Sequence, residues 1–265
     1  MNNQITEFDP KAFRRALGNF ATGVTVITAT TPTGEKTGVT ANSFNSVSLE
    51  PPLILWSIDK RSGSCAIFEK ASHFAVNILA ADQIDLSNHF ARPSEDKFAG
   101  VDYQTGLGGA PLLPDCSASF QCESYQTLDG GDHWILIGKV VSFEDAGRAP
   151  LVYHQGSYSV VMPHSRFPAK KDNEPAAIER LKSRFKDHYY YQMVQAVRAY
   201  QADYAPLQLS TGLRTSEARM LMVLQETPQL QRKELLKEVN MPEGEVDNAA
   251  DILQRKGLIT HNQEA

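Results

Sequence analysis

The spacing of apolar residues along this chain changes once, near residue 165. Before that point, short runs of β-branched and aromatic residues recur between turn-forming residues, a pattern typical of strands. Beyond it, apolar residues recur at every third or fourth position, a pattern typical of amphipathic helices. The sequence therefore predicts a mainly β region followed by an all-α region.

The β region has few helical patterns between its predicted strands. They are confined to about residues 11–19, 66–70 and 81–90. A parallel doubly wound sheet needs a helix between successive strands, so a closed antiparallel barrel fits this region better. The predicted strands are Gly23–Thr30, Lys36–Ala41, Leu53–Ile58, His73–Leu79, Ala118–Tyr125, Trp134–Glu144 and Ser157–Met162.

A segment with the composition of an exposed linker separates the two regions. Pro163, Pro168 and Pro175 occur within it, and a charged run fills the space between the last two. Prolines and charged residues interrupt regular structure and favour solvent. We therefore expect a first domain over residues 1–164, a linker over 165–175 and a helical domain over 176–265.

The helical region begins with one long apolar stripe, from Ile178 to Tyr204, which predicts a single long helix. Such a stripe either packs within the chain or forms a dimer contact. Three shorter helices are predicted over Thr215–Gln225, Gln231–Val239 and Glu243–Lys256. Their order is that of a helix-turn-helix or winged-helix unit.

Charge disfavours nucleic acid as a partner. The chain has 26 Lys and Arg against 31 Asp and Glu, a net charge of −5. The last predicted helix is acidic as well, whereas binding to a phosphate backbone requires cations. No stretch approaches the ~18 apolar residues of a membrane span, and Met1–Phe8 lacks a signal-peptide pattern. We therefore expect a cytoplasmic protein without a membrane partner.

The three cysteines, Cys65, Cys116 and Cys122, lack the spacing of a metal site or a disulfide framework. We expect no metal. The thiols are expected to act as small buried apolar groups.

Two turns carry most of the polar side chains of the β region. Hydroxyl and amide groups are concentrated between Thr37 and Ser48, where they would suit the edge of a heteroaromatic ring. A second turn places Lys60 and Arg61 beside two serines, the usual equipment for one phosphate. Taken one at a time, each turn is more typical of ordinary loop chemistry.

Together with other motifs, the two turns are much more specific. The combination resembles the short-chain flavin reductases, the reductase components of two-component aromatic monooxygenases such as the 4-hydroxyphenylacetate hydroxylases. The resemblance covers about residues 10–162. It is carried, in this order along the chain, by Ala21–Val26, Thr40–Phe44, Pro51–Pro52, Phe74–Leu79, Asp96–Phe98 and Gly131–His133.

The resemblance implies a split β-barrel fold, usually dimeric. Proteins of this kind bind FMN or FAD and use NADH or NADPH to supply free reduced flavin to a separate oxygenase. We lean toward FMN, because no second pocket for an adenine is readable in the sequence. A Rossmann glycine motif is not needed for this chemistry, since the resembled family has none.

The resemblance also implies site residues, position by position. Thr40, Ala41, Asn42 and Ser43 would line the flavin ring and ribityl chain, with Ser46 and Ser48 just beyond. The residues that would hold the ribityl phosphate are Ser57, Asp59, Lys60, Ser62, Gly63, Ser64 and Cys65. The segment that would close over the cofactor contains Phe90, Ala91, Arg92, Lys97 and Phe98, with Arg92 and Lys97 adding positive charge.

Two further residues belong to the nicotinamide side of this implied site. His133 would orient the nicotinamide, and Tyr158 would lie near the same cleft. Considered without the motif, His133 is a histidine at the mouth of the barrel that Asp132 satisfies.

The helical region resembles the MarR-like winged-helix extension of some reductase components, in which an aromatic substrate of the oxygenase stimulates the reductase. The tyrosines near Tyr189 and Tyr200, beside Arg198, would then bind a phenolic acid. The alternative is that they form a core and dimer contact. A different class of function also remains: a non-catalytic split-barrel sensor or regulator that binds flavin or heme and acts through its helical tail.

Overall fold

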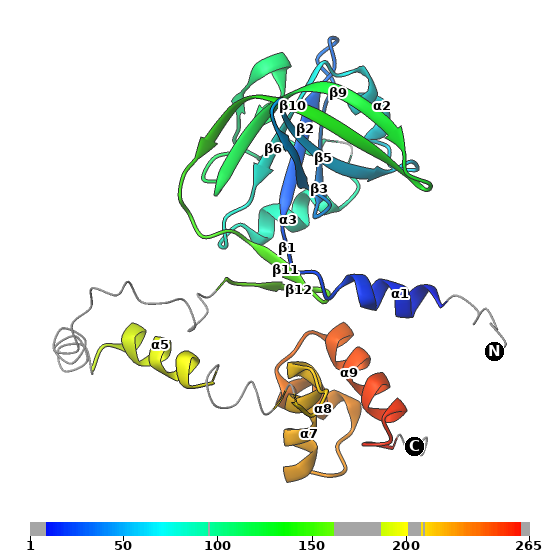
Figure 1. Cartoon of the computed structure of the whole chain (residues 1–265), viewed down its shortest axis with the longest axis vertical. Helices are drawn as coiled ribbons and strands as arrows, with labels where there is room; N and C mark the ends of the chain where they lie inside the picture. The colour runs from blue at the N-terminus through cyan, green and yellow to red at the C-terminus, as the bar shows by residue number, and fades with distance from the viewer. Residues whose placement is uncertain (1–8, 95, 162–186, 201–207, 209, 261–265) are drawn as a thin grey trace. The chain divides into compact units, whose positions relative to one another are not determined.

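The computed structural model describes residues 9–94, 96–161, 187–200, 208 and 210–260. The chain divides into two compact units, Met1–Val161 and Met162–Ala265. The first unit is built mainly of strands and the second of helices, as the change in apolar spacing predicts (Figure 1). Each unit is described by itself.

The strand pairs of the first unit are antiparallel, as the scarcity of intervening helices predicts. A seven-stranded sheet has the order β3-β2-β6-β9-β10-β5-β4, and two small sheets have the orders β1-β11-β12 and β7-β8. The strands are β1 (Thr22–Gly23), β2 (Thr25–Thr30), β3 (Lys36–Ala41), β4 (Asn45–Leu49), β5 (Pro52–Asp59), β6 (His73–Ile78), β7 (Gln104–Thr105), β8 (Pro111–Leu112), β9 (Ala118–Asp129), β10 (His133–Asp145), β11 (Val152–His154) and β12 (Ser157–Ser159).

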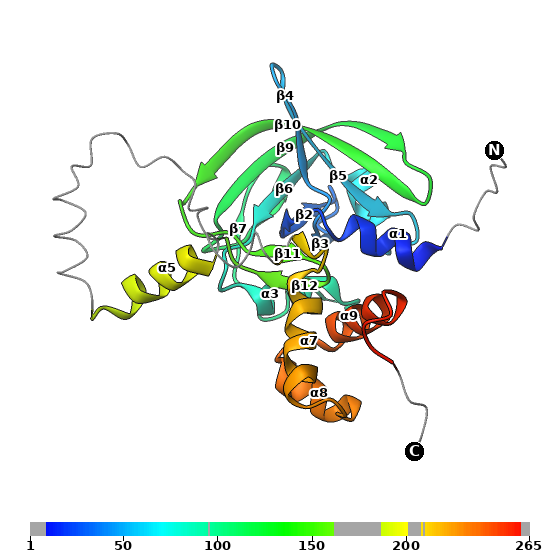
Figure 2. The same cartoon turned by 60° about the horizontal axis from the view of Figure 1, so that its bottom comes forward.

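The prediction of a closed barrel is wrong in one respect. The large sheet has two free edges, β3 and β4, and β3 contacts β5 without pairing with it. The second half of β5 lies beyond the end of β4, whose last partner toward Asp59 is Leu55, and no ladder joins that half to β3. Figure 2 shows β4 in a hairpin that projects from the curved sheet.

Two predicted strands have different bounds. The predicted strand Gly23–Thr30 is interrupted at Val24, which separates β1 from β2. The Val24 N–H donates a hydrogen bond to the Leu151 C=O, and the Val24 C=O accepts one from the Leu79 N–H. The predicted strand Ser157–Met162 ends at Ser159, and Met162 is outside the described residues. β4 was not predicted, because the residues of this strand are mostly exposed and polar and contain no apolar run.

Three helices accompany the sheets of the first unit: α1 (Pro10–Leu17), α2 (Cys65–Lys70) and α3 (Ile84–Ala91). A short 3₁₀ helix, η1, spans Leu107–Gly109. One core cluster packs Trp56 and Phe74 against Phe68 of α2. A second cluster packs Phe90 of α3 against Val26 and Leu79. Cys116 and Cys122 are buried free thiols, as predicted, and burial raises the pKa of each to about 12.

The second unit contains the three predicted short helices, α7 (Thr215–Glu226), α8 (Arg232–Val239) and α9 (Glu243–Arg255). Met220, Val246 and Leu253 form their buried core. Glu217 is also buried, and its carboxylate accepts a hydrogen bond from Lys256 Nζ at 2.9 Å. The acidic residues Glu243 and Asp247 pair with Arg232.

The long helix predicted from Ile178 to Tyr204 is described only in part. Tyr189–Ala199 forms α5, which agrees with the prediction over that stretch. The rest of the predicted helix, except for Asp187, His188 and Tyr200, lies outside the described residues, as does the predicted linker 165–175.

The packing of α3 on β3 generates a stability prediction at Gly38. A Cβ added there would lie 2.5 Å from two ring atoms of Phe90, which is 0% exposed. We expect Gly38→Ala to lower the free energy of unfolding by about 1–3 kcal/mol, the usual cost of overpacking. Gly23→Ala is the control, since Gly23 is also in a strand and has nothing within 4 Å of the added carbon. Equal urea denaturation midpoints for the two variants would contradict the assigned packing.

Candidate functional site

The site is built around the seam where β3 faces β5. Ser43 Oγ accepts a hydrogen bond from the Ser57 N–H at 2.9 Å and donates one to the Ser57 C=O at 3.1 Å. One serine side chain thus satisfies both backbone groups that a neighbouring strand would normally satisfy. The seam is held by a side chain and is not closed by a strand ladder.

A second hydroxyl bridge crosses the seam near the other end of β3. Thr37 Oγ1 and Ser64 Oγ are 2.7 Å apart, and both residues are buried. This bridge ties β3 to the turn that follows β5. Thr37 was not predicted as a site residue, although it begins the hydroxyl-rich segment of the sequence.

Between the two bridges, β3 presents a free edge. Backbone groups of alternate residues in a strand point to the same edge. The Gly38 C=O on this edge accepts a hydrogen bond from Lys97, so the backbone groups of Thr40 face the same way. The Thr40 hydroxyl is bound to the Ser87 C=O of α3 at 2.7 Å. Ala41 is half-buried and Asn42 is exposed, so short side chains continue along this end of β3.

The turn after β5 is tightly hydrogen-bonded, as expected of a rigid binding loop. The Asp59 carboxylate accepts hydrogen bonds from the Arg61 guanidinium and from the Arg61 N–H. These bonds hold the pKa of Asp59 well below its usual value. The Asp59 C=O accepts from the Ser62 N–H at 2.9 Å and from Cys65 Sγ at 3.1 Å. Asp59, Ser62, Gly63, Ser64 and Cys65 therefore belong to one compact turn.

Lys60, a predicted phosphate ligand, contacts the β9–β10 hairpin. Its ammonium lies 2.8 Å from Asp129 Oδ2 and 4.4 Å from the centroid of the Trp134 ring. Both partners belong to the β9–β10 hairpin. The charge of Lys60 is neutralised there, so we assign the side chain to the hairpin contact.

Lys97, a further predicted cation of the site, contacts two backbone carbonyl groups. Its half-buried ammonium donates hydrogen bonds to the Gly38 C=O at 2.8 Å and the Phe90 C=O at 3.0 Å, and burial lowers its pKa. Lys97 therefore clamps its loop to β3 and α3. Phe90 is fully buried, and Phe98 packs against it with ring centroids 5.3 Å apart. The two rings support the seam from within the core.

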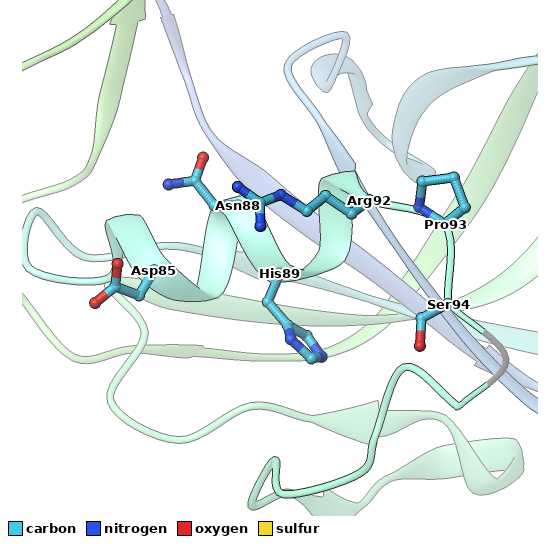
Figure 3. Close-up of a pocket in the computed structure, with 6 residues that line it drawn as sticks. All are labelled: Asp85, Asn88, His89, Arg92, Pro93 and Ser94. Atoms are coloured by element: carbon cyan, nitrogen blue, oxygen red, sulfur yellow. The ribbon is translucent and has the colours of Figure 1, made fainter.

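Arg92 is a predicted cation that does border a cavity. This cavity has a volume of about 430 Å³. Figure 3 shows the residues that line this cavity. Asp85, Asn88 and His89 belong to α3, and Arg92 follows the last residue of the helix. The Arg92 side chain extends back along the helix toward Asn88. Ala91 is exposed beside Arg92. Within the part of the chain that the structure describes, Arg92 forms no ion pair.

Tyr158 joins β12 to α3 next to this cavity. Its hydroxyl donates a hydrogen bond to Asn88 Oδ1 at 2.9 Å and lies 2.9 Å from Ser87 Oγ. Because Ser87 also anchors Thr40, a short chain of contacts links Tyr158 to the free edge of β3.

His133 begins β10 directly opposite Asp59 of β5. Its Nδ1 lies 2.7 Å from Asp132 Oδ1, and its side chain is 42% exposed. The hydrogen bond to His133 lowers the pKa of Asp132. The ring is thus held by its neighbour and remains partly open to solvent.

Ser46 and Ser48 are not brought to this turn. They pair with Ile54 and Leu53, near the end of β5 that is remote from Asp59. Ser46 is exposed, and Ser48 Oγ accepts a hydrogen bond from the Glu50 N–H. Both serines lie in the projecting hairpin, and their contact with a flavin stays a prediction.

The residues that the structure describes contain neither a cluster of metal-ligating side chains nor a helix that could span a membrane. Among them, no three His, Cys, Asp or Glu side chains are grouped so that they could hold a metal ion. None of their helices is long and apolar enough to cross a bilayer.

The fold and the seam together define a mainly β domain with an open, polar binding edge. Residues 17–162 match the flavin reductase like domain. This chain therefore belongs to the flavin reductase like family.

Several characterised proteins are similar to this domain. The reductase component of the flavin-dependent trigonelline monooxygenase of Acinetobacter baylyi is 51% identical over 148 residues, which cover 56% of this chain and 48% of that protein. The FMN reductase (NADH) SmoA of Agrobacterium fabrum is 44% identical and is covered over 84% of its length. The stachydrine N-demethylase reductase subunit Stc3 of Rhizobium meliloti is 45% identical, with 66% covered. The chain thus spans about half the length of the trigonelline monooxygenase reductase component and about two thirds of the length of Stc3.

Among solved structures, the NADH:FAD oxidoreductase SgcE6 of Streptomyces globisporus C-1027, in complex with NAD and FAD fragments, has a TM-score of 0.56 and 36% identity. The match covers 60% of this chain and 98% of that chain. The flavin reductase PheA2 has a TM-score of 0.53 and 37% identity, with 59% of this chain and 100% of that chain covered. The mainly β domain is therefore confirmed as flavin reductase-like.

The clamp role of Lys97 generates a second prediction. Lys97→Met removes two charge-assisted hydrogen bonds to backbone carbonyls, so it should lower the free energy of unfolding by about 1.5–3 kcal/mol. The control is Lys70→Met at an exposed position of α2, which should leave stability unchanged. Thermal and urea unfolding measure both effects. If Lys97→Met unfolds as wild type does, Lys97 is free to serve as a ligand and the clamp assignment is wrong.

Proposed function

We propose that this chain is an NAD(P)H:flavin oxidoreductase that reduces FMN or FAD and supplies reduced flavin to a separate aromatic monooxygenase. The observation that carries the proposal is the open edge of β3, which offers Thr40, Ala41 and Asn42 beside a rigid turn. The relatives named as reductase components, and the solved relative with NAD and FAD fragments, support it.

The residues at the seam fit a flavin. Its pyrimidine edge needs several hydrogen-bond donors in one plane and space for a flat ring. The unpaired edge of β3 supplies backbone donors, and the side chains next to them are short. Thr40, Ala41, Asn42 and Ser43 would hold the ring, and donors at its edge favour the negative charge that develops on reduction.

The turn Asp59–Cys65 would hold the ribityl phosphate. The Arg61 and Ser62 N–H groups are bound to Asp59, and the Ser62 hydroxyl accepts a hydrogen bond from the Ser64 N–H at 3.3 Å, so the turn is rigid. Lys60 is committed to Asp129, so we propose that positive charge comes from Arg92, which borders a cavity. We place FMN ahead of FAD, and NADH ahead of NADPH, as the SmoA name supports.

Bound flavin supplies the ring that accepts a hydride from the nicotinamide. The part played by the protein is to orient the two rings. His133, which Asp132 holds from behind, would position the nicotinamide, and Tyr158 would border the same cleft. No nucleophile or metal is required of the protein in this proposal.

Purified protein tests the proposal. NADH consumption that depends on added FMN or FAD is the expected result. If neither flavin supports oxidation of NADH or NADPH, but flavin or heme still binds, the chain is a non-catalytic sensor or regulator.

The role of His133 generates a third prediction. His133→Ala should raise the KM for NADH, or slow flavin reduction, about tenfold or more, because a positioning contact is lost. Flavin affinity should stay nearly constant. His154→Ala is the matched control, at an intermediate position of β11. Stopped-flow reduction that is identical in wild type and His133→Ala would remove His133 from the site.

We also propose roles for the helical region, residues 176–265. It would form a MarR-like, winged-helix-like domain that senses a phenolic effector or joins two chains in a cytoplasmic homodimer. The three-helix layout of α7, α8 and α9 supports this, and the engagement of Arg232 by acidic groups speaks against nucleic acid as the ligand.

Truncation provides the fourth prediction. A chain that ends near Pro168 should fold, bind flavin and reduce it, because it corresponds to relatives that this chain covers over 98–100% of their length. Its rate should no longer respond to phenolic acids such as 4-hydroxyphenylacetate, because an effector acts only through a region that binds it differently in two states. Steady-state NADH oxidation measures both properties. A truncated enzyme that still responds would place the effector site in the β domain, and a full-length enzyme that never responds would leave dimerisation as the role of the tail.

A further inference from the structure

A second cavity lies between α2 and the β9–β10 hairpin, and it borders the seam turn, because Ile58 of β5 and Cys65 are among its lining residues. Its volume is about 390 Å³, within the range of about 300–1,000 Å³ that small-molecule pockets occupy. Its aromatic walls come from Phe68, Phe74 and Trp134. Its polar lining includes Glu69, Gln126 and Thr127.

The floor of this cavity is preformed. Phe68 and Phe74 are 4% and 2% exposed. Both pack edge-on against the fully buried Trp56, at ring-centroid distances of 4.7 and 6.2 Å. A ligand would therefore meet rings that the core already holds in place, and little ordering would accompany binding.

The mouth of the cavity already holds one cation–π contact. Trp134, which lines the cavity and is 37% exposed, carries the Lys60 ammonium 4.4 Å from its ring centroid. Lys60 is itself paired with Asp129 at 2.8 Å, so these two charges neutralise each other at the mouth. The indole environment is thus one in which a cation is stable.

Glu69 is the charged residue among those that line the cavity. It is exposed, and within the described part of the chain it forms no ion pair. Gln126 and Thr127, on the opposite wall, likewise form no side-chain hydrogen bond there. The cavity therefore combines aromatic rings, an unneutralised carboxylate and free polar groups.

We propose that this cavity binds a small organic cation that carries an aromatic ring, of the aromatic quaternary ammonium class. The ring would lie against Phe68 and Phe74, and the methylated nitrogen would be attracted by Glu69 and the Trp134 ring. A ligand of the same size that carries a carboxylate would be repelled by Glu69. This selectivity for a cation distinguishes the ligand of the cavity from the ligand proposed for the seam, which carries phosphate.

The two tryptophans of the chain make the test specific. Full-length protein is saturated with FMN and titrated with benzyltrimethylammonium chloride, while the two indole N–H signals are followed by NMR. Trp134→Phe assigns the signals. We expect a saturable shift of the Trp134 signal, no shift of the Trp56 signal, and no saturable shift with phenylacetate.

Variants then test whether the Glu69 carboxylate attracts the cation. Glu69→Gln should weaken binding of the cation about fivefold, whereas Glu123→Gln, which removes the same charge from β9 outside the cavity, should leave it unchanged. Thr127→Trp fills the cavity and should abolish binding. An unperturbed Trp56 signal, from a residue 0% exposed, verifies that each variant is folded.

Three results would each overturn the proposal. The first is the lack of a saturable Trp134 shift in the wild-type protein. The second is equal binding of benzyltrimethylammonium and phenylacetate, or equal effects of Glu69→Gln and Glu123→Gln. The third is a saturable Trp134 shift in FMN-free protein that is lost once FMN saturates the protein, which would make the cavity part of the flavin site.

Discussion

The hydrogen bonds of the Ser43 side chain to the backbone of Ser57 hold the arrangement on which the candidate site depends. If a strand paired with β5 at this point, the sheet would close and the edge of β3 would be covered. The Ser43 hydroxyl satisfies the same two backbone groups of Ser57 and leaves the edge of β3 uncovered. The barrel therefore stays split, and a strip of backbone next to Thr40 stays open without leaving Ser57 unsatisfied.

The other parts of the seam support this opening. The Thr37–Ser64 contact fixes its far end, and Lys97 fixes the loop that borders it. Phe90 fills the space beneath β3 so closely that only glycine fits at position 38. The ammonium groups of Lys60 and Lys97 contact other parts of the domain, while the open groups at the seam belong largely to the backbone.

The sequence predicts the antiparallel mainly β unit and the three short helices because both depend on local apolar spacing. The bounds of β3, Lys36–Ala41, match the prediction. Local spacing does not reveal that Val24 interrupts the predicted strand by bonding to Leu151 and Leu79. Nor does it reveal that β4, which has no apolar run, pairs with β5. For the same reason the turn from Asp59 to Cys65 was predictable as a unit, whereas the partners of Lys60 and Lys97 were not. Asp129 and Gly38 are distant in sequence, and only the fold brings them to these ammonium groups.

Hydrogen exchange with and without FMN tests the central claim most directly, because it reports on backbone amides and does not depend on catalysis. The account predicts that FMN slows exchange in two separate peptides, one covering Thr40–Ser43 and one covering Ser57–Cys65, while β4 and helices α7–α9 remain unchanged. Protection confined to the β9–β10 hairpin or to the helical unit, with no change at the seam, would contradict the account.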